Sequence, residues 1–160
     1  MATLGVTSQT PLALDNDVFT DWRNGRPHIL NLVQAYQERQ KLPPALTAMT
    51  AFQARFGFEK ERARLGALDE RFERARVGME RMIEECGVLE INQQATAIAA
   101  FVFAHLSASE RNRHWADVFI AAAAMAHGYG VATRNQRDFE LIGQYLPSYA
   151  PVLFLAIWKS

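Results

Sequence analysis

Three aspartates beside apolar segments constrain the fold of this chain more than any other feature. Asp15 directly follows an apolar run that is typical of a short buried strand. Asp117 stands at the start of an apolar helical stretch, and Asp138 follows another short apolar segment. A carboxylate is costly to bury unless it is paired or bound to a cation. A fold that brings the three side chains together would therefore form a site for a hard cation.

The apolar pattern predicts short strands that alternate with helices, which indicates an α/β fold with a mostly parallel sheet. In such sheets, functional sites lie outside the carboxyl ends of the strands. Asp15 follows the first predicted strand, and Asn135 and Asp138 follow the fourth, so we expect a shared site. The predicted strands cover 10–14, 46–49, 88–91, 131–133 and 151–157. The predicted helices cover 15–22, 28–40, 59–86, 92–107, 114–127 and 138–145, and a further helix opens at Thr50.

Composition sets the remaining bounds. A length of 160 residues predicts a single domain over 1–160, and 49% hydrophobic residues exclude a disordered chain. A net charge of zero excludes a uniformly basic surface that coats nucleic acid. Cys86 is the only cysteine, so no internal disulfide can form. The first ten residues show no secretory signal pattern, and the longest apolar run, 118–126, is too short to span a membrane. We therefore expect a cytoplasmic protein with no membrane association.

The segment 59–86 carries an apolar stripe with steps of three and four residues. One interpretation is an amphipathic helix or helical hairpin that packs on its own domain, and we favour it. The other is a surface for a dimer or partner. Gly66 and Gly78 argue against one long rigid helix. The stripe consists of Leu65, Leu68, Phe72, Ala75, Met79, Met82 and Cys86.

The acidic residues have both a chemical and a structural interpretation. Mg²⁺ and Mn²⁺ prefer carboxylate oxygens, and three close carboxylates without a metal should raise at least one pKa. Taken singly, each aspartate is also compatible with a helix cap. In that interpretation Asp15 or Asp17 caps the first helix, Asp117 the Ala-rich helix, and Asp138 the next one.

Four segments together resemble the motifs of PIN-domain proteins, in particular the VapC-like toxin ribonucleases. The segment 14–17 (LDND) is similar to the first acidic motif of that family, and 53–57 (QARFG) to a segment that normally starts with Glu. The segment 116–122 (ADVFIAA) is similar to the central Asp motif and is the most specific match. The segment 133–139 (TRNQRDF) resembles the last motif.

The resemblance implies a PIN-like three-layer sandwich, with a four- to five-stranded sheet between helices. It also implies binding of Mg²⁺ or Mn²⁺, cleavage of RNA phosphodiester bonds, frequent homodimers and, for toxins, a cognate antitoxin. By the resemblance, the metal ligands are Asp15, Asp117 and Asp138, with Asn135 and Gln53 as neutral helpers. Gln53 stands where the family has Glu, and its amide oxygen can still accept or ligate. This departure supports an alternative hypothesis, a catalytically weakened PIN-like module that binds RNA or a protein partner.

Several other polar residues have open roles. Arg134 and Arg137 either bind RNA phosphates or neutralise the nearby carboxylates. We interpret His114 as a polar residue at a helix start, although it could touch substrate. Trp22 and Trp115 could stack on bases, but core packing is the favoured interpretation. The histidines show no paired zinc spacing with Cys86, and the 107–109 segment has no triad partner.

Overall fold

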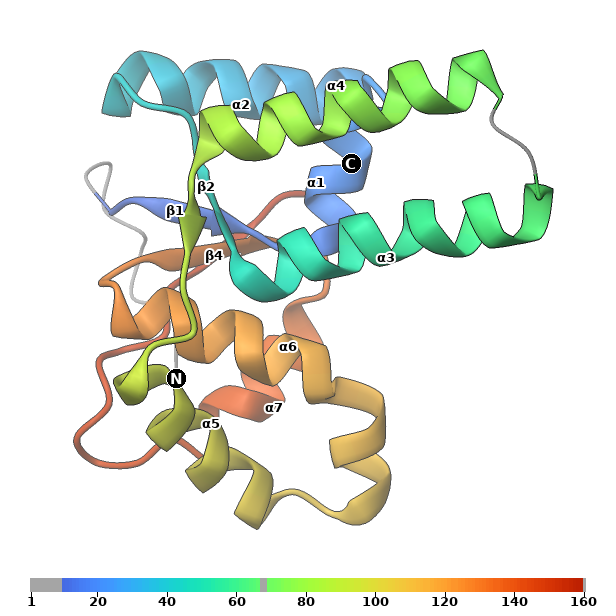
Figure 1. Ribbon diagram of the computed structural model, residues 1–160. Coiled ribbons are helices and arrows are strands. Elements are labelled where there is room, and N and C mark those ends of the chain that lie inside the picture. Colours follow the sequence, from blue (N-terminus) through green and yellow to red (C-terminus); the bar gives the residue numbers. More distant parts are fainter. Residues whose placement is uncertain (1–9, 67–68, 160) are drawn as a thin grey trace.

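A five-stranded parallel sheet forms the centre of the computed structural model, which describes residues 10–66 and 69–159 (Figure 1). Each pair of neighbouring strands is parallel, in the order β3-β2-β1-β4-β5. This confirms the predicted α/β fold. The strands are β1 (Leu12–Leu14), β2 (Ala45–Thr47), β3 (Val88–Leu89), β4 (Gly130–Thr133) and β5 (Leu155–Ile157).

Helices cover both faces of the sheet, as the side-chain alternation of the strands requires. Leu12 and Leu14 of β1 point into one apolar core with α1, α2 and α4, whereas Ala13 points into the other with α5, α6 and α7. Figure 1 shows these two helical layers on either side of the strands. The helices are α1 (Asn16–Arg23), α2 (Pro27–Gln40), α3 (Ala48–Leu65), α4 (Glu70–Cys86), α5 (Gln93–His105), α6 (Ala108–Ala126) and α7 (Gln136–Gly143).

The first helix begins one residue after β1, and Asp15 is its N-cap. The backbone of Asp15 is extended, and its Oδ1 accepts a hydrogen bond from the Val18 amide at 2.9 Å. The alternative cap, Asp17, lies within the first turn of α1. Because the strand leads straight into the helix, the last strand residue and the cap are consecutive. This places the Asp15 carboxylate at the carboxyl edge of the sheet.

The segment predicted as one helix or a hairpin over 59–86 is a hairpin. Its first arm, α3, begins at Ala48 and ends at Leu65, and the positive φ of 69° at its C-cap, Gly66, suits a residue without a Cβ. Ion pairs join the two arms, with Arg55 contacting Glu80 and Arg62 contacting Glu73, both at 2.9 Å. The arms diverge from the sheet toward the right of Figure 1.

The apolar stripe divides between the core and the surface. Met79 is 2% exposed, and Met82 and Cys86 pack against the same core as β1. Leu65 is 43% exposed at the end of α3. The favoured interpretation, packing on its own domain, therefore fits the second half of the stripe, whereas Leu68 lies outside the described residues.

The Ala-rich helix α6 starts earlier than the sequence pattern predicted, and this corrects two interpretations. Ser107 and Glu110 form a capping box, in which each side chain bonds the backbone amide of the other. The helix therefore begins at Ala108, and both His114 and Asp117 lie inside it rather than at its start. Asp117 is not a cap.

The last helix also begins before its acidic residue. Asn135 occupies the cap position of α7, and Asp138 lies in the first turn. The cap interpretation of Asp138 is therefore wrong as well. Within the part of the chain that the structure describes, no helix combines the length and apolar character that a membrane span requires.

Candidate functional site

The site lies where the carboxyl ends of β1 and β4 meet. These two strands are hydrogen-bonded neighbours, with Leu14 opposite Ala132. Asp15 follows β1, while Asn135 and Asp138 follow β4. Asp117 comes from α6, which packs against β4 and α7. The fold thus brings together polar side chains from segments more than a hundred residues apart in the chain.

Asp15 is the most buried of the acidic side chains, at 2% exposure. One carboxylate oxygen caps α1, and the other accepts a hydrogen bond of 2.6 Å from the Thr133 hydroxyl at the end of β4. Burial raises the pKa of Asp15 to about 6, although these two hydrogen bonds and the charge of Arg134 act in the opposite direction. Asp15 is therefore fixed in position and carries a costly buried charge at neutral pH.

Asp117 has the more strongly shifted pKa. Burial first, and then the charges of Asp15, Asp138 and Asp17 in that order, together raise this pKa to about 7. Such mutual repulsion is the behaviour expected of carboxylates that share one site without a cation. The structure thus brings the three aspartates of the sequence hypothesis into a common acidic cluster, with Asp17 at its border.

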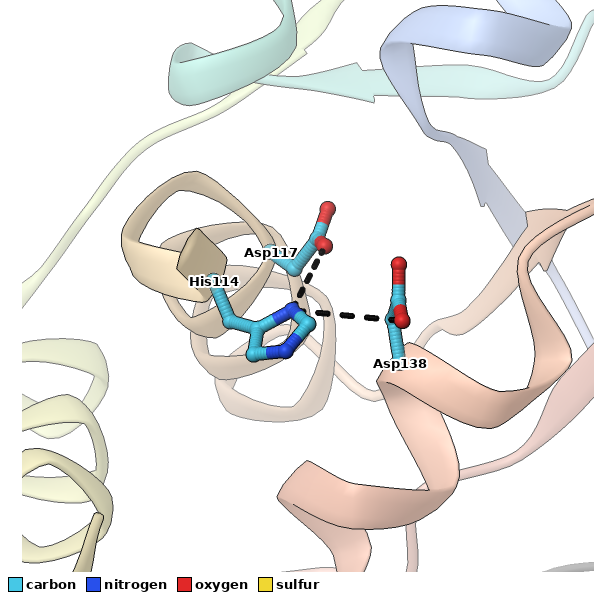
Figure 2. Close-up of side chains that lie close together, drawn as sticks. All are labelled: His114, Asp117 and Asp138. Carbon is cyan, nitrogen blue, oxygen red and sulfur yellow. Dashed lines mark ion pairs between the residues drawn. The ribbon is translucent and has the colours of Figure 1, made fainter. Parts of the chain in front are cut away.

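His114 is part of this cluster, and the sequence interpretation missed that placement. Its Nδ1 lies 3.8 Å from Asp117 Oδ2 and 4.0 Å from Asp138 Oδ1. Figure 2 shows the imidazole with this nitrogen turned toward both carboxylates. One ligand atom from each of the three residues lies within 4.8 Å of the others. The available signal was the spacing of His114 and Asp117, because residues i and i+3 share a helix face.

Asn135 is held by two contacts at the edge of the cluster. Its backbone amide donates to the Thr133 hydroxyl at 2.9 Å, and its side-chain amide donates to Asp17 Oδ2 at 2.7 Å. The Thr133 hydroxyl therefore accepts from Asn135 and donates to Asp15. A single buried hydroxyl links the ends of β1 and β4.

The two arginines of the last motif have different surroundings. Arg134 donates to Asp21 at 2.9 Å, and its Nε lies 3.8 Å from Asp17 Oδ2, so it neutralises carboxylates. Both arginines are exposed and line a hollow of about 510 Å³ that also contains Asp138 and Lys159. Arg137 makes no ion pair among the described residues, so of the two cations it is the one that suits an external anion better.

Gln53 lies on α3, where it lines a separate hollow of about 390 Å³ together with Asn16, Thr20 and Arg23. Its Oε1 is buried and has no hydrogen-bond partner among the described residues, and the same holds for Asn16 Oδ1. Asn16 directly follows Asp15 in the chain, but no aspartate of the acidic cluster lines this hollow. Gln53 is not one of the three residues that group around His114.

An exposed aromatic group lies on the neighbouring surface. Phe52 stacks on Phe56 with ring centroids 5.8 Å apart, and Trp115 meets Phe52 edge-on at 6.5 Å. Trp115 is 43% exposed, so its core-packing interpretation is wrong. Trp22, by contrast, packs against the core and contacts Phe19. Phe52 and Trp115 each adjoin a site residue in the chain, Gln53 and His114.

The donor set fits a divalent cation. Asp117 and Asp138 supply carboxylate oxygens, and His114 Nδ1, which has no hydrogen-bond partner among the described residues, faces the same space. A bound cation would offset the negative charges that, together with burial, raise the pKa of Asp117.

Solved structures of the same architecture come from toxin–antitoxin complexes. VapBC2 from Rickettsia felis, bound to a DNA fragment from its promoter, matches with a TM-score of 0.64 at 14% identity, over 92% of this chain and 98% of that chain. DNA-bound VapBC from Salmonella typhimurium matches with a TM-score of 0.64 at 22% identity, over 94% and 100%. The VapBC-5 toxin–antitoxin member from Mycobacterium tuberculosis matches with a TM-score of 0.55 at 21% identity, over 91% and 95%.

The chain has a PIN-like fold. No protein-family model matches it, and no curated protein matches it by sequence. The likeness is therefore one of architecture: the PIN-like sheet order and helical layers are shared at low identity.

Proposed function

We propose that this protein is a metal-dependent ribonuclease of the PIN type that hydrolyses RNA phosphodiester bonds. The observation that carries the proposal is the convergence of Asp15, Asp117 and Asp138 at the carboxyl edge of a PIN-like sheet. Burial and the charges of the neighbouring aspartates raise the pKa of Asp117, which gives the cluster a physical reason to bind Mg²⁺ or Mn²⁺.

Each residue has a defined task in this proposal. Asp15, Asp117 and Asp138 hold the cation, which supplies an activated water and stabilises charge on the phosphate. Thr133 holds the Asp15 carboxylate, and its accepted bond from the Asn135 amide fixes the start of α7. Asn135 and Gln53 offer neutral polar groups beside the acidic cluster.

Exposed cations and aromatic rings support RNA as the substrate. Arg137 and Lys159 line the hollow beside Asp138 and suit phosphate groups, and Trp115 with Phe52 offers stacking faces for unpaired bases. In this proposal Arg134 orients carboxylates and contributes less to RNA binding, because it already pairs with Asp21.

Arg137→Gln should weaken the binding of single-stranded RNA and lower its salt dependence. Loss of one phosphate contact reduces the slope of log K against log salt by about 0.7 for a single strand. Fluorescence anisotropy with a labelled oligoribonucleotide in metal-free buffer measures both quantities. Arg39→Gln removes an exposed charge from the last turn of α2 and serves as the matched control. An unchanged salt slope in Arg137→Gln would remove Arg137 from the RNA-binding surface.

The toxin–antitoxin neighbours support a protein partner for this chain. We propose a cognate antitoxin, a homodimeric state and a cytoplasmic location, as in a toxin–antitoxin system. Co-expression with the product of an adjacent small open reading frame tests the first, since an antitoxin should copurify and inhibit cleavage. Light scattering at micromolar concentration tests the homodimeric state, and a monomer mass would contradict it.

The second candidate function is a PIN-like module that binds RNA or a protein partner without cleaving RNA. The feature that favours it is Gln53, which brings no charge to a position where the resembled family has a carboxylate. A titration of Mg²⁺ and Mn²⁺ with an RNA cleavage assay distinguishes the two. Metal-dependent cleavage supports the enzyme, whereas RNA binding without cleavage at any metal concentration supports the module.

Gln53→Glu should tighten divalent metal binding severalfold, because hard cations are held largely by charge. If the missing charge limits the reaction, cleavage of RNA should increase as well. Calorimetric titration with Mn²⁺, beside the cleavage assay, measures both. Gln94→Glu adds the same charge at an exposed position of α5 and is the control. Equal metal affinity in Gln53→Glu and the parent protein would show that the side chain at position 53 points into the neighbouring hollow and does not contact the metal.

A further inference from the structure

His114 is a buried residue of the site, and the ring nitrogen that faces Asp117 and Asp138 makes no hydrogen bond with any described residue. The residue is 5% exposed, and its Nδ1 has no partner among the described residues. A buried polar group left unpaired destabilises the folded state. The nearest acidic groups to this nitrogen are the carboxylates of Asp117 and Asp138, and both lie beyond hydrogen-bonding distance.

The two distances from the His114 nitrogen suit one metal ion. Two ligands that each lie ~2.1 Å from an ion are separated by roughly 3.0 to 4.2 Å, depending on the angle between the bonds. The His114 nitrogen lies 3.8 and 4.0 Å from the two carboxylate oxygens, which is within that range. A charged hydrogen bond between imidazolium and carboxylate would instead close to about 2.7–2.9 Å. The geometry therefore matches an ion between the groups better than a direct ion pair.

We propose that His114 Nδ1 is a ligand of the cation held by Asp117 and Asp138, and that this nitrogen makes the site selective for a first-row transition-metal dication over Mg²⁺. This inference rests on the proposed metal-dependent function and adds a ligand to it. Imidazole binds first-row transition ions more readily than Mg²⁺, with an affinity that rises from Mn²⁺ to Co²⁺ along the series, whereas Mg²⁺ keeps oxygen ligands and water.

The neutral Gln53 makes a nitrogen ligand more consequential. With Gln53 uncharged, the acidic cluster holds fewer carboxylates than the four-acid arrangement that its motifs resemble. A site with fewer negative charges attracts Mg²⁺ less, because Mg²⁺ depends on charge and ideal oxygen geometry. Imidazole coordination supplies affinity without charge, and does so for transition ions in particular.

The test measures coordination directly and needs no cleavage. The full-length protein, stripped with chelator, is loaded with Mn²⁺ alone and examined by pulsed electron paramagnetic resonance for the coupling of a directly bound ¹⁴N. Calorimetry gives the affinities for Mn²⁺, Co²⁺ and Mg²⁺. We expect ¹⁴N coupling in the parent protein and in His105→Gln, a control for an exposed histidine of α5. We expect no coupling in His114→Gln.

His114→Gln should also lose affinity for Mn²⁺ and Co²⁺ by tenfold or more (about 1.4 kcal/mol per decade), with a much smaller loss for Mg²⁺. Circular dichroism confirms that the variant is folded, and His114→Asn provides a second side chain should it not be. Bound Mn²⁺ without ¹⁴N coupling, or equal losses for Mg²⁺ and Mn²⁺, would overturn the role of His114 while leaving the metal-dependent function in place. No divalent binding by the parent protein would overturn both.

Discussion

Asp117→Asn is expected to lower metal-dependent RNA cleavage by about a hundredfold or more, a typical cost for removing a group that stabilises charge in an active site. The substitution keeps the size of the side chain but removes a negative charge from the centre of the cluster. Single-turnover cleavage of a pool of single-stranded RNA, at saturating Mn²⁺, measures the effect. Metal affinity from calorimetry should fall in parallel.

The matched control for this loss is Glu70→Gln, which removes an exposed charge from the first turn of α4. Its cleavage rate should equal that of the parent protein. Parent-like cleavage by Asp117→Asn would contradict the assignment of the acidic cluster as the catalytic site. If neither protein cleaves RNA but both bind it, the binding module becomes the better description.

The metal-free protein should lose stability as the pH rises from about 4 to 7. The pKa values of Asp15 and Asp117 are raised in the folded state, to about 6 and about 7, above the ordinary value of 3.8. The folded state therefore binds more protons than the unfolded chain in this window, and the free energy of unfolding decreases with pH. The loss is complete above the folded-state pKa values, so it should be largest near pH 8.

Asp117→Asn isolates this effect because the amide does not titrate. The rise of the Asp117 pKa from 3.8 to about 7 corresponds to an upper limit of about 4 kcal/mol, or a Tm difference of roughly 8–16 °C in a chain of this size. Calorimetric scans in chelator should therefore show the variant with the higher Tm at pH 8, and a much smaller difference at pH 5. Added Mn²⁺ should raise the Tm of the parent protein at pH 8 and close the gap. A Tm difference that does not change with pH would mean that the pKa of Asp117 is not raised in the folded protein.

The sequence predicted the α/β order well because the strands are short, apolar and bounded by polar residues. Asp15 and Asp138 were placed near one edge of the sheet, since each follows a predicted strand. The helix bounds were weaker. The start of α6 was missed because Ser107 was assigned to the end of the preceding predicted helix, 92–107, whereas its spacing to Glu110 is that of a capping box.

The error at α6 also concealed His114. Moving the helix start to Ala108 places His114 two turns inside the helix, on the face of Asp117. Its burial and its approach to Asp138 depend on the docking of α7 against α6, a tertiary contact that no local pattern encodes. The exposure of Trp115 is likewise a matter of packing, because Phe52, the α3 side chain that it contacts, is itself exposed.

The double hydrogen bonding of Asp15 has a consequence for how such a chain can drift in evolution. Its carboxylate caps α1 and holds Thr133, so folding alone favours a short side chain with an oxygen at this position. A lineage that no longer needed catalysis would still be selected to keep Asp or Asn there. Asp117 differs, because its charge among other carboxylates weakens the metal-free fold. In a lineage that no longer binds metal, the acid at position 117 should therefore be lost before the one at position 15. Comparing positions 15 and 117 among homologues should distinguish active enzymes from inactive ones.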